Sequence, residues 1–312
     1  MAKKEFTIPS TNGKNQLHTV LWTPETKTPI GIVQISHGMI EYVNRYDRFA
    51  TFLAEQGFVV IGNDHLGHGK TARDEEELGY MDSPDGSLAI VRDLHRVSRY
   101  VKKRYPNLPF FLLGHSMGSF MARRYAMTYG EELDGLLLLG TGYQPKPVLL
   151  MAYTVLTLLH LTVGDHCRSL LMEFLAFGTY NFRILDEKSL HAWVTRDKKI
   201  LEAYDNDPFC TFRFTVNGYK TLFDTLWYIE KAENIAKLPK DLPMFFASGD
   251  ADPVGGYKKG VKRVVEEYRK KGILEVDLIF YQGARHEILN ELEYDRAQED
   301  ILEWLMGQLE RL

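Results

Sequence analysis

Apolar residues in the first half of the chain fall into short, uninterrupted runs, which are separated by segments where apolar positions recur at helical spacing. The runs predict strands at residues 16–22, 30–36, 58–63, 110–114 and 135–139. The segments between them predict helices at residues 45–56, 85–105 and 117–129. Buried strands that alternate with helices are typical of a mostly parallel sheet covered on both faces, so we predict an α/β fold.

The pattern changes after residue 142. Residues 143–236 have a helical pattern rich in Leu, Phe, Tyr and Trp, and the alternation of strands and helices returns only afterwards. The last part of the chain predicts strands at residues 244–248 and 275–280 and helices at residues 256–271 and 294–309. We therefore predict one α/β core, made of residues 1–142 and 237–312, that is interrupted by a helical cap at residues 143–236.

The composition of the 312 residues narrows the class of protein. Hydrophobic residues make up 45% and charged residues 26%, which is usual for a globular protein with a large core. The net charge is −4 and no block of Lys and Arg stands out, so we expect no nucleic-acid partner. Cys167 and Cys210 are too few for a disulfide framework. No secretory leader and no apolar run of about 18 residues is evident, so we expect a cytoplasmic protein.

Ser116 is the first candidate for chemistry. It lies in Gly114-His115-Ser116-Met117-Gly118, which matches G-x-S-x-G, between a predicted buried strand and a predicted helix. A serine at such a sharp turn projects its hydroxyl above the carboxyl edge of the sheet, where it can act as a nucleophile. The alternative is a serine that only caps the helix.

A serine nucleophile needs a histidine base and an acid that orients the base, and in this kind of fold they follow in the order Ser, acid, His. Asp252 follows the strand predicted at residues 244–248, and His286 follows the strand predicted at residues 275–280. We assign Asp252 as the acid and His286, the only histidine after residue 191, as the base. Asp250 competes for the acid role, but it lies closer to the strand, where an aspartate usually bonds turn backbone.

Acyl transfer also requires two backbone N–H donors for the oxyanion. Met117 follows the nucleophile directly, and Met39 lies in the loop after the strand predicted at residues 30–36, so we predict these two donors. Asp64, His65 and His68 resemble part of a metal cluster, but no other group completes it. We therefore predict no metal and interpret residues 63–69 as a glycine-rich loop that braces the site.

Together these motifs resemble the monoglyceride lipase and lysophospholipase branch of the α/β-hydrolases. The segments that carry the resemblance are 37–39 with Glu41 and 45–46, 64–69, 114–118, 249–254 and 283–286. The resemblance implies a triad of Ser116, Asp252 and His286, oxyanion donors at Met39 and Met117, a helical cap and no cofactor. It also implies a small-molecule acyl ester as substrate.

One position departs from the family. Monoglyceride lipases have a second histidine three residues after the catalytic one, where this chain has Leu289. Glu41 and Arg45 remain as candidate contacts to the alcohol part of the substrate. Because they lie one helical turn apart, the alternative is a salt bridge within the loop.

The cap carries the information on substrate. Residues 148–163 contain no Asp, Glu, Lys or Arg, and we expect them to help form the entrance to an acyl pocket and to contact a lipid surface. Leu156 and Leu159 are the residues chosen to test this, since a helix packed inside the cap would have the same composition. The oligomeric state stays open.

We predict a serine carboxylic ester hydrolase that acts on lipid-like or medium-chain acyl esters through an acyl-enzyme. One alternative is a peptidase or amidase of the prolyl aminopeptidase type, which would need acidic groups in the cap, such as Glu173, Glu202 or Asp205, to hold a substrate amine. The other alternative is a non-catalytic binding protein on the same scaffold.

Overall fold

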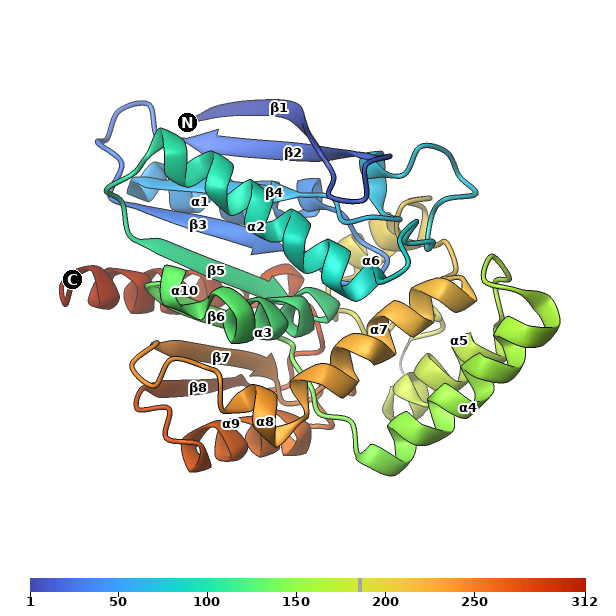
Figure 1. Cartoon of the computed structure of the whole chain (residues 1–312). Coiled ribbons are helices and arrows are strands. Elements are labelled where there is room, and N and C mark those ends of the chain that lie inside the picture. Colours follow the sequence, from blue (N-terminus) through green and yellow to red (C-terminus); the bar gives the residue numbers. More distant parts are fainter. Residues whose placement is uncertain (185–186) are drawn as a thin grey trace.

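The central sheet determines where every candidate residue lies. The computed structural model describes residues 1–184 and 187–312, and within these ranges eight strands form one sheet in the order β1-β2-β4-β3-β5-β6-β7-β8 (Figure 1). The strand β2 is antiparallel to β1 and β4, and the other neighbours are parallel. The strands are β1 (Ala2–Pro9), β2 (Gln16–Thr23), β3 (Gly31–Ser36), β4 (Phe58–Asn63), β5 (Phe110–His115), β6 (Gly135–Leu139), β7 (Met244–Gly249) and β8 (Val276–Tyr281).

Helices cover both faces of this sheet, which confirms the predicted α/β fold. One face is packed by α1 (Asp47–Gln56) and α10 (Tyr294–Leu309). The other face is packed by α2 (Gly86–Arg104), α3 (Met117–Tyr129) and α9 (Lys259–Lys270). With both faces covered, strands β3 to β7 are buried along their whole length, which explains their continuous apolar runs.

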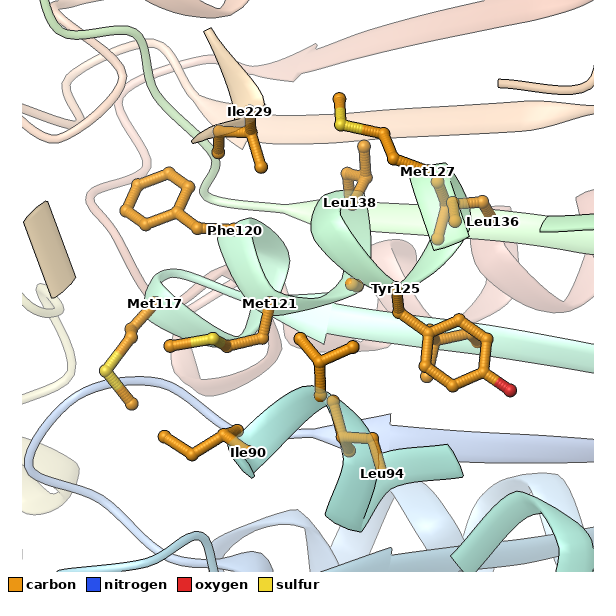
Figure 2. Close-up of a cluster of buried hydrophobic side chains, with 14 of the residues drawn as sticks. Ile90, Leu94, Met117, Phe120, Met121, Tyr125, Met127, Leu136, Leu138 and Ile229 are labelled. Carbon is orange, nitrogen blue, oxygen red and sulfur yellow. The ribbon is translucent and has the colours of Figure 1, made fainter. Parts of the chain in front are cut away.

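The helix α3, which begins directly after Ser116, lies in the larger core. Its residues Met121 and Tyr125 are fully buried in a cluster with side chains of α2 and β6 (Figure 2). Burial of a side chain of this size contributes about 2 kcal/mol. This packing fixes the N-terminal end of α3 against the carboxyl edge of the sheet.

The segment between β6 and β7 is helical, and its described residues contain no strand. It comprises α4 (Lys146–Val163), α5 (Leu170–Phe177), a 3-10 turn (Tyr180–Arg183), α6 (Lys198–Asp205), α7 (Val216–Ile229) and α8 (Ala232–Ile235). The helix α7 contacts α4 on one side and α2 and α3 on the other, and Figure 1 shows it crossing between them. Because α7 belongs to both packing layers, the boundaries of the cap stay a prediction.

Three features differ from the sequence-based expectations. The edge strand β1 was not predicted, since only Ile8 among its eight residues is buried. The predicted helices at 45–56 and 256–271 begin later, at Asp47 and Lys259. The helix α4 has 18 residues, which by length and composition is enough to cross a membrane, although we expected no run of that length. Its buried residues Leu149, Ala152 and Leu156 recur at helical spacing, so one face of α4 packs within the protein.

Candidate active site

Ser116 occupies the sharp turn between β5 and α3. Its backbone has φ 51° and ψ −122°, a conformation that L-residues rarely adopt. Two glycines make the turn possible. A Cβ on Gly118 would lie 2.0 Å from the Ser36 carbonyl oxygen, and a Cβ on Gly114 would lie 2.4 Å from the Gly118 carbonyl oxygen. The glycines of the motif are therefore required by the close approach of neighbouring backbone.

Asp252 and His286 form a buried pair at the carboxyl ends of β7 and β8. The His286 Nδ1 lies 3.0 Å from Asp252 Oδ2. The Asp252 carboxylate also accepts hydrogen bonds from the Val254 N–H at 2.8 Å and the Ser248 hydroxyl at 3.3 Å. These bonds fix the carboxylate, which in turn orients the imidazole ring.

Ser116 and His286 line the same cavity. The Nε2 atom of His286 is buried and has no hydrogen-bond partner among the described residues, Ser116 included. With Nδ1 bonded to the carboxylate, Nε2 is the nitrogen left to accept a proton. The structure thus brings the three predicted residues together at one edge of the sheet.

Asp250, the competing acid, makes different contacts. Its Oδ1 accepts the Gly283 N–H at 2.7 Å, and its Oδ2 lies 3.6 Å from Lys258 Nζ. It therefore joins its own loop to the loop that carries His286, as an aspartate in a turn commonly does.

Met39 and Met117, the predicted oxyanion donors, both line the cavity beside Ser116. A Cβ on Gly38 would lie 3.0 Å from Ser116 Cβ, so the loop that carries Met39 packs directly against Ser116. Among the described turns and loops, neither the Met39 N–H nor the Met117 N–H donates a hydrogen bond. Both donors are therefore available to an oxygen bound next to Ser116.

Glu41 and Arg45 form the salt bridge that the sequence left as an alternative, with Arg45 Nη1 3.1 Å from Glu41 Oε2. Glu41 lines the cavity. Arg45 does not line it, but its salt-bridge partners Glu41 and Glu287 do. Arg45 also makes a bidentate bond to Glu287, at 2.5 and 2.7 Å.

Glu41 is the centre of this buried network. Its Oε1 accepts from Tyr46 Oη at 2.9 Å, lies 2.9 Å from His115 Nδ1, and also accepts the Gly38 N–H. Burial alone would raise the pKa of the Glu41 carboxyl, but the neighbouring His115 and Arg45 outweigh burial and hold that pKa below its ordinary range.

Two polar residues of this network were not identified as candidates from the sequence. Glu287 and His115 both line the cavity, next in sequence to His286 and Ser116. Their adjacency to the catalytic candidates was the only signal available. Leu289, the position that departs from the family, does not line the cavity. It packs with the core under α1 and α10, and its carbonyl accepts a bond from Arg48.

The cavity above Ser116 has a volume of about 660 Å³ and is mostly apolar. Its cap-side walls include Leu170, Phe174, Phe177, Trp193 and Phe212. The helical segment between β6 and β7 also contacts His286, since the Trp193 ring lies 5.1 Å from the His286 ring and the backbone N–H of His286 donates to the Trp193 carbonyl at 3.3 Å. No described residue of α4 lines the cavity, so the expectation that residues 148–163 form its entrance is wrong.

A serine at a strand-to-helix turn that lines one cavity with a buried Asp–His pair, under helices inserted into a mostly parallel sheet, defines an α/β-hydrolase. The chain belongs to the Hydrolase_4 family, described as serine aminopeptidase, S33, whose model matches residues 27–293.

Known relatives agree with this assignment. The chain is 27% identical over 296 residues to a monoacylglycerol lipase of Mycolicibacterium smegmatis, covering 93% of this chain and 92% of that protein. It is 28% identical over 280 residues to the human monoglyceride lipase, covering 87% of this chain and 80% of that protein. Among solved structures, a thermostable carboxyl esterase from Bacillus coagulans in complex with glycerol is 33% identical, with a TM-score of 0.91 over 99% of both chains. These likenesses confirm the predicted resemblance to monoglyceride lipases.

Proposed function

We propose that this hydrolase is a serine carboxylic ester hydrolase of the monoglyceride lipase type, with Ser116 as nucleophile, His286 as base and Asp252 as the acid that orients the base. The observation that carries the proposal is that Ser116, at its sharp turn, lines one cavity with His286, whose Nδ1 lies 3.0 Å from Asp252 Oδ2.

The proposed reaction has two halves. His286 Nε2 takes the proton of the Ser116 hydroxyl while Oγ attacks the ester carbonyl carbon, and the oxyanion accepts hydrogen bonds from the Met39 and Met117 N–H groups. His286 then gives the proton to the departing alkoxide oxygen as its bond to the acyl carbon breaks, so that the alcohol leaves and an acyl-enzyme remains. In the second half, His286 takes a proton from water while the water oxygen attacks the acyl carbonyl carbon. The bond from this carbon to Ser116 Oγ then breaks, the carboxylic acid leaves, and His286 returns the proton to Ser116.

The substrate we propose is a monoacylglycerol or a related lipid-like or medium-chain acyl ester. The apolar cavity of about 660 Å³ suits the acyl chain, and the relatives include lipases named for monoacylglycerol. On the alcohol side, Glu41 would contact the substrate and Arg45 would hold Glu41 in place. No cofactor or nucleic acid takes part in this proposal.

A peptidase is the second candidate, because the family is described as a serine aminopeptidase. An aminopeptidase needs a free carboxylate near the site for the substrate amine. Of the three cap carboxylates suggested by the sequence, only Glu173 lines the cavity, and it is paired with Arg213 at 2.6 Å. This pairing favours the ester hydrolase.

The cap also motivates a proposal on location. Leu170, Phe174, Phe182 and Leu190 line the cavity and are at least 63% exposed, so an apolar surface surrounds the entrance. We propose a cytoplasmic enzyme with residues 143–236 as its cap, which contacts lipid aggregates or membranes peripherally through this surface.

One experiment tests the activity and separates the candidates. The purified protein is treated with a fluorophosphonate probe, and the labelled residue is identified by mass spectrometry. It is also assayed on p-nitrophenyl esters of graded chain length and on matched aminoacyl p-nitroanilides. The proposal requires labelling of Ser116 and faster turnover of the esters. Labelling with faster turnover of the anilides would favour the peptidase, and no labelling would favour a non-catalytic protein.

A further inference from the structure

The loop of residues 37–41, which places Met39 beside Ser116, has an unfavourable backbone. Ile40 has φ 56°, in the left-handed region that a β-branched residue rarely adopts. Such a conformation persists only where surrounding contacts hold it. The loop must therefore be fixed by interactions outside its own backbone.

Three backbone polar groups on either side of Met39 have hydrogen-bond partners. The Gly38 N–H donates to Glu41, the Ile40 carbonyl accepts from Tyr204 Oη at 3.2 Å, and the Gly38 carbonyl lies 2.8 Å from His37 Nδ1. The Met39 N–H donates to no acceptor among the described loop bonds. It is therefore available as one of the two donors that the proposed reaction needs.

The state of His37 follows from its second contact. Its Nε2 accepts the backbone N–H of His65 at 2.9 Å, so the ring proton must be on Nδ1, where it is donated to the Gly38 carbonyl. His37 is fully buried, and burial lowers its pKa, which keeps the ring neutral with a single N–H.

The hydrogen bond from His37 to the Gly38 carbonyl also fixes the direction of the Met39 N–H, because both groups belong to the peptide between Gly38 and Met39. The peptide is trans and planar, so its C=O and N–H point to opposite sides. His37 holds the oxygen on the buried side, where its ring packs 4.1 Å from the ring of His65. The Met39 N–H consequently points to the other side, where Met39 and Ser116 line the cavity.

We propose that His37 is a positioning residue for the oxyanion hole: the chain from the His65 N–H through the His37 ring to the Gly38 carbonyl turns the Met39 N–H toward the oxyanion. His37 does not line the cavity and acts only through the peptide. This inference rests on the proposed function and deepens it, because it assigns a residue that organises the same site.

Two substitutions separate the bond that His37 accepts from the His65 N–H from the bond that it donates to the Gly38 carbonyl. His37→Asn keeps an amide donor near the position of Nδ1 but loses the acceptor. His37→Gln keeps an amide near the position of Nε2 but loses the donor. Loss of one oxyanion donor typically lowers kcat about 10²–10³-fold. We expect His37→Gln to lower kcat on p-nitrophenyl butyrate by about 10²-fold with KM changed less than about threefold, and His37→Asn to stay within about fivefold of wild type.

A trifluoromethyl ketone, which binds a nucleophilic serine as a tetrahedral oxyanion, gives an independent measurement. Its affinity should fall in His37→Gln by about the same factor as kcat/KM, whereas a merely structural role would not link the two. If His37→Gln does not fold, His37→Met, which lacks both hydrogen-bonding atoms, carries the same expectation.

His68→Asn is the matched control for packing. His68 is equally buried, its ring lies 5.2 Å from that of His37, and its Nδ1 lies 2.9 Å from the Leu66 carbonyl oxygen rather than the loop of Met39. It should change the melting temperature while leaving kcat near wild type.

The inference is overturned if His37→Gln keeps kcat within about threefold of wild type, if His37→Asn loses as much as His37→Gln, or if His68→Asn loses as much kcat at equal stability. Each of these results would leave the wild-type activity and the labelling of Ser116 intact. A wild-type protein that neither labels nor hydrolyses esters would instead remove the proposed function, and the role of His37 with it.

Discussion

Asp252 and Asp250 lie two residues apart in one loop and have different partners. The carboxylate of Asp252 contacts the imidazole of His286, while that of Asp250 holds the backbone of Gly283. The first bond selects the tautomer of His286, and the second connects two loops. A substitution that keeps shape but removes charge should therefore distinguish them.

We expect Asp252→Asn to lower kcat on p-nitrophenyl butyrate by roughly 10³–10⁴-fold, because an amide can donate to Nδ1 and so favours the wrong tautomer. Asp250→Asn should lower kcat by less than about tenfold, since an amide oxygen still accepts the Gly283 N–H. Steady-state kinetics of both variants provide the measurement. The opposite ranking would transfer the acid role to Asp250.

At the scale of single residues, the sequence identified candidate site residues where a motif or a fixed order along the chain links a residue to its place in the fold. The turn motif and the order of acid and base identified Ser116, Asp252 and His286 as candidates, and the structure brings them together. It was uninformative where the outcome depends on distant segments. That Leu289 packs against the core, and that Glu287 binds Arg45, follows from how the loop after β8 meets the loop after β3.

At the scale of elements, the apolar composition of α4 predicted that it helps form the cavity entrance, whereas in the structure α5 rather than α4 lines the cavity. The apolar residues of α4 split between a buried face and an exposed face, with Leu156 3% exposed and Leu161 73% exposed. The helix α5 supplies the entrance, since Leu170 both lines the cavity and is 63% exposed. The sequence of α4 predicts an apolar helix, but only packing against α7 decides which leucines are covered.

Charge substitution tests this division. Leu170→Glu should leave the melting temperature nearly unchanged and preserve activity on acetate esters, while activity on micellar long-chain esters falls about tenfold, because a carboxylate at the entrance opposes entry of an acyl chain. Leu156→Glu buries an unpaired carboxylate and should lower stability by several kcal/mol. Thermal melts and assays below and above the critical micelle concentration provide the measurements.

Leu161→Glu separates the entrance from the lipid contact, since Leu161 is exposed on α4 and does not line the cavity. It should weaken activity on micelles and leave activity on monomeric esters unchanged. Unchanged micellar activity in both Leu161→Glu and Leu170→Glu would contradict contact between the cap and lipid.

The edge strand β1 is the strand that the hydrophobic pattern of the sequence did not predict. An edge strand pairs on one side only, and β1 places most of its side chains in solvent, so no apolar run or alternation marks it. The buried strands were predicted to within a residue or two, because they are continuously apolar.

At the scale of the whole molecule, one buried arginine of the core contacts both ends of the helical segment between β6 and α8. Arg123 of α3 donates to the carbonyl of Gly142, which lies between β6 and α4, at 3.0 Å. It also lies 3.8 Å from the carboxylate of Glu230, where the chain leaves α7. Burial raises the pKa of Glu230 to about 7, although Arg123 opposes the rise.

This pKa makes stability depend on pH. The folded protein keeps the Glu230 proton up to about pH 7, whereas the unfolded chain releases it near 4.5, so this contribution is lost as the pH rises between these values. From pH 5 to pH 8 the wild type should lose on the order of 2 kcal/mol relative to Glu230→Gln, as measured by urea unfolding. Glu233→Gln, at an exposed position of α8, serves as the control and should follow the wild type. Parallel stability curves for wild type and Glu230→Gln would rule out a raised pKa.

The unusual backbone of Ser116 implies a conflict between activity and durability. A residue held at φ 51° and ψ −122° costs the folded state roughly 1–3 kcal/mol unless it is glycine. Ser116→Gly should therefore melt at a higher temperature than Ser116→Ala, although both lack the hydroxyl and we expect both to be inactive. If so, selection for catalysis keeps this chain less heat-resistant than its own scaffold allows, and an inactive descendant that has lost the serine would be free to become the more durable protein.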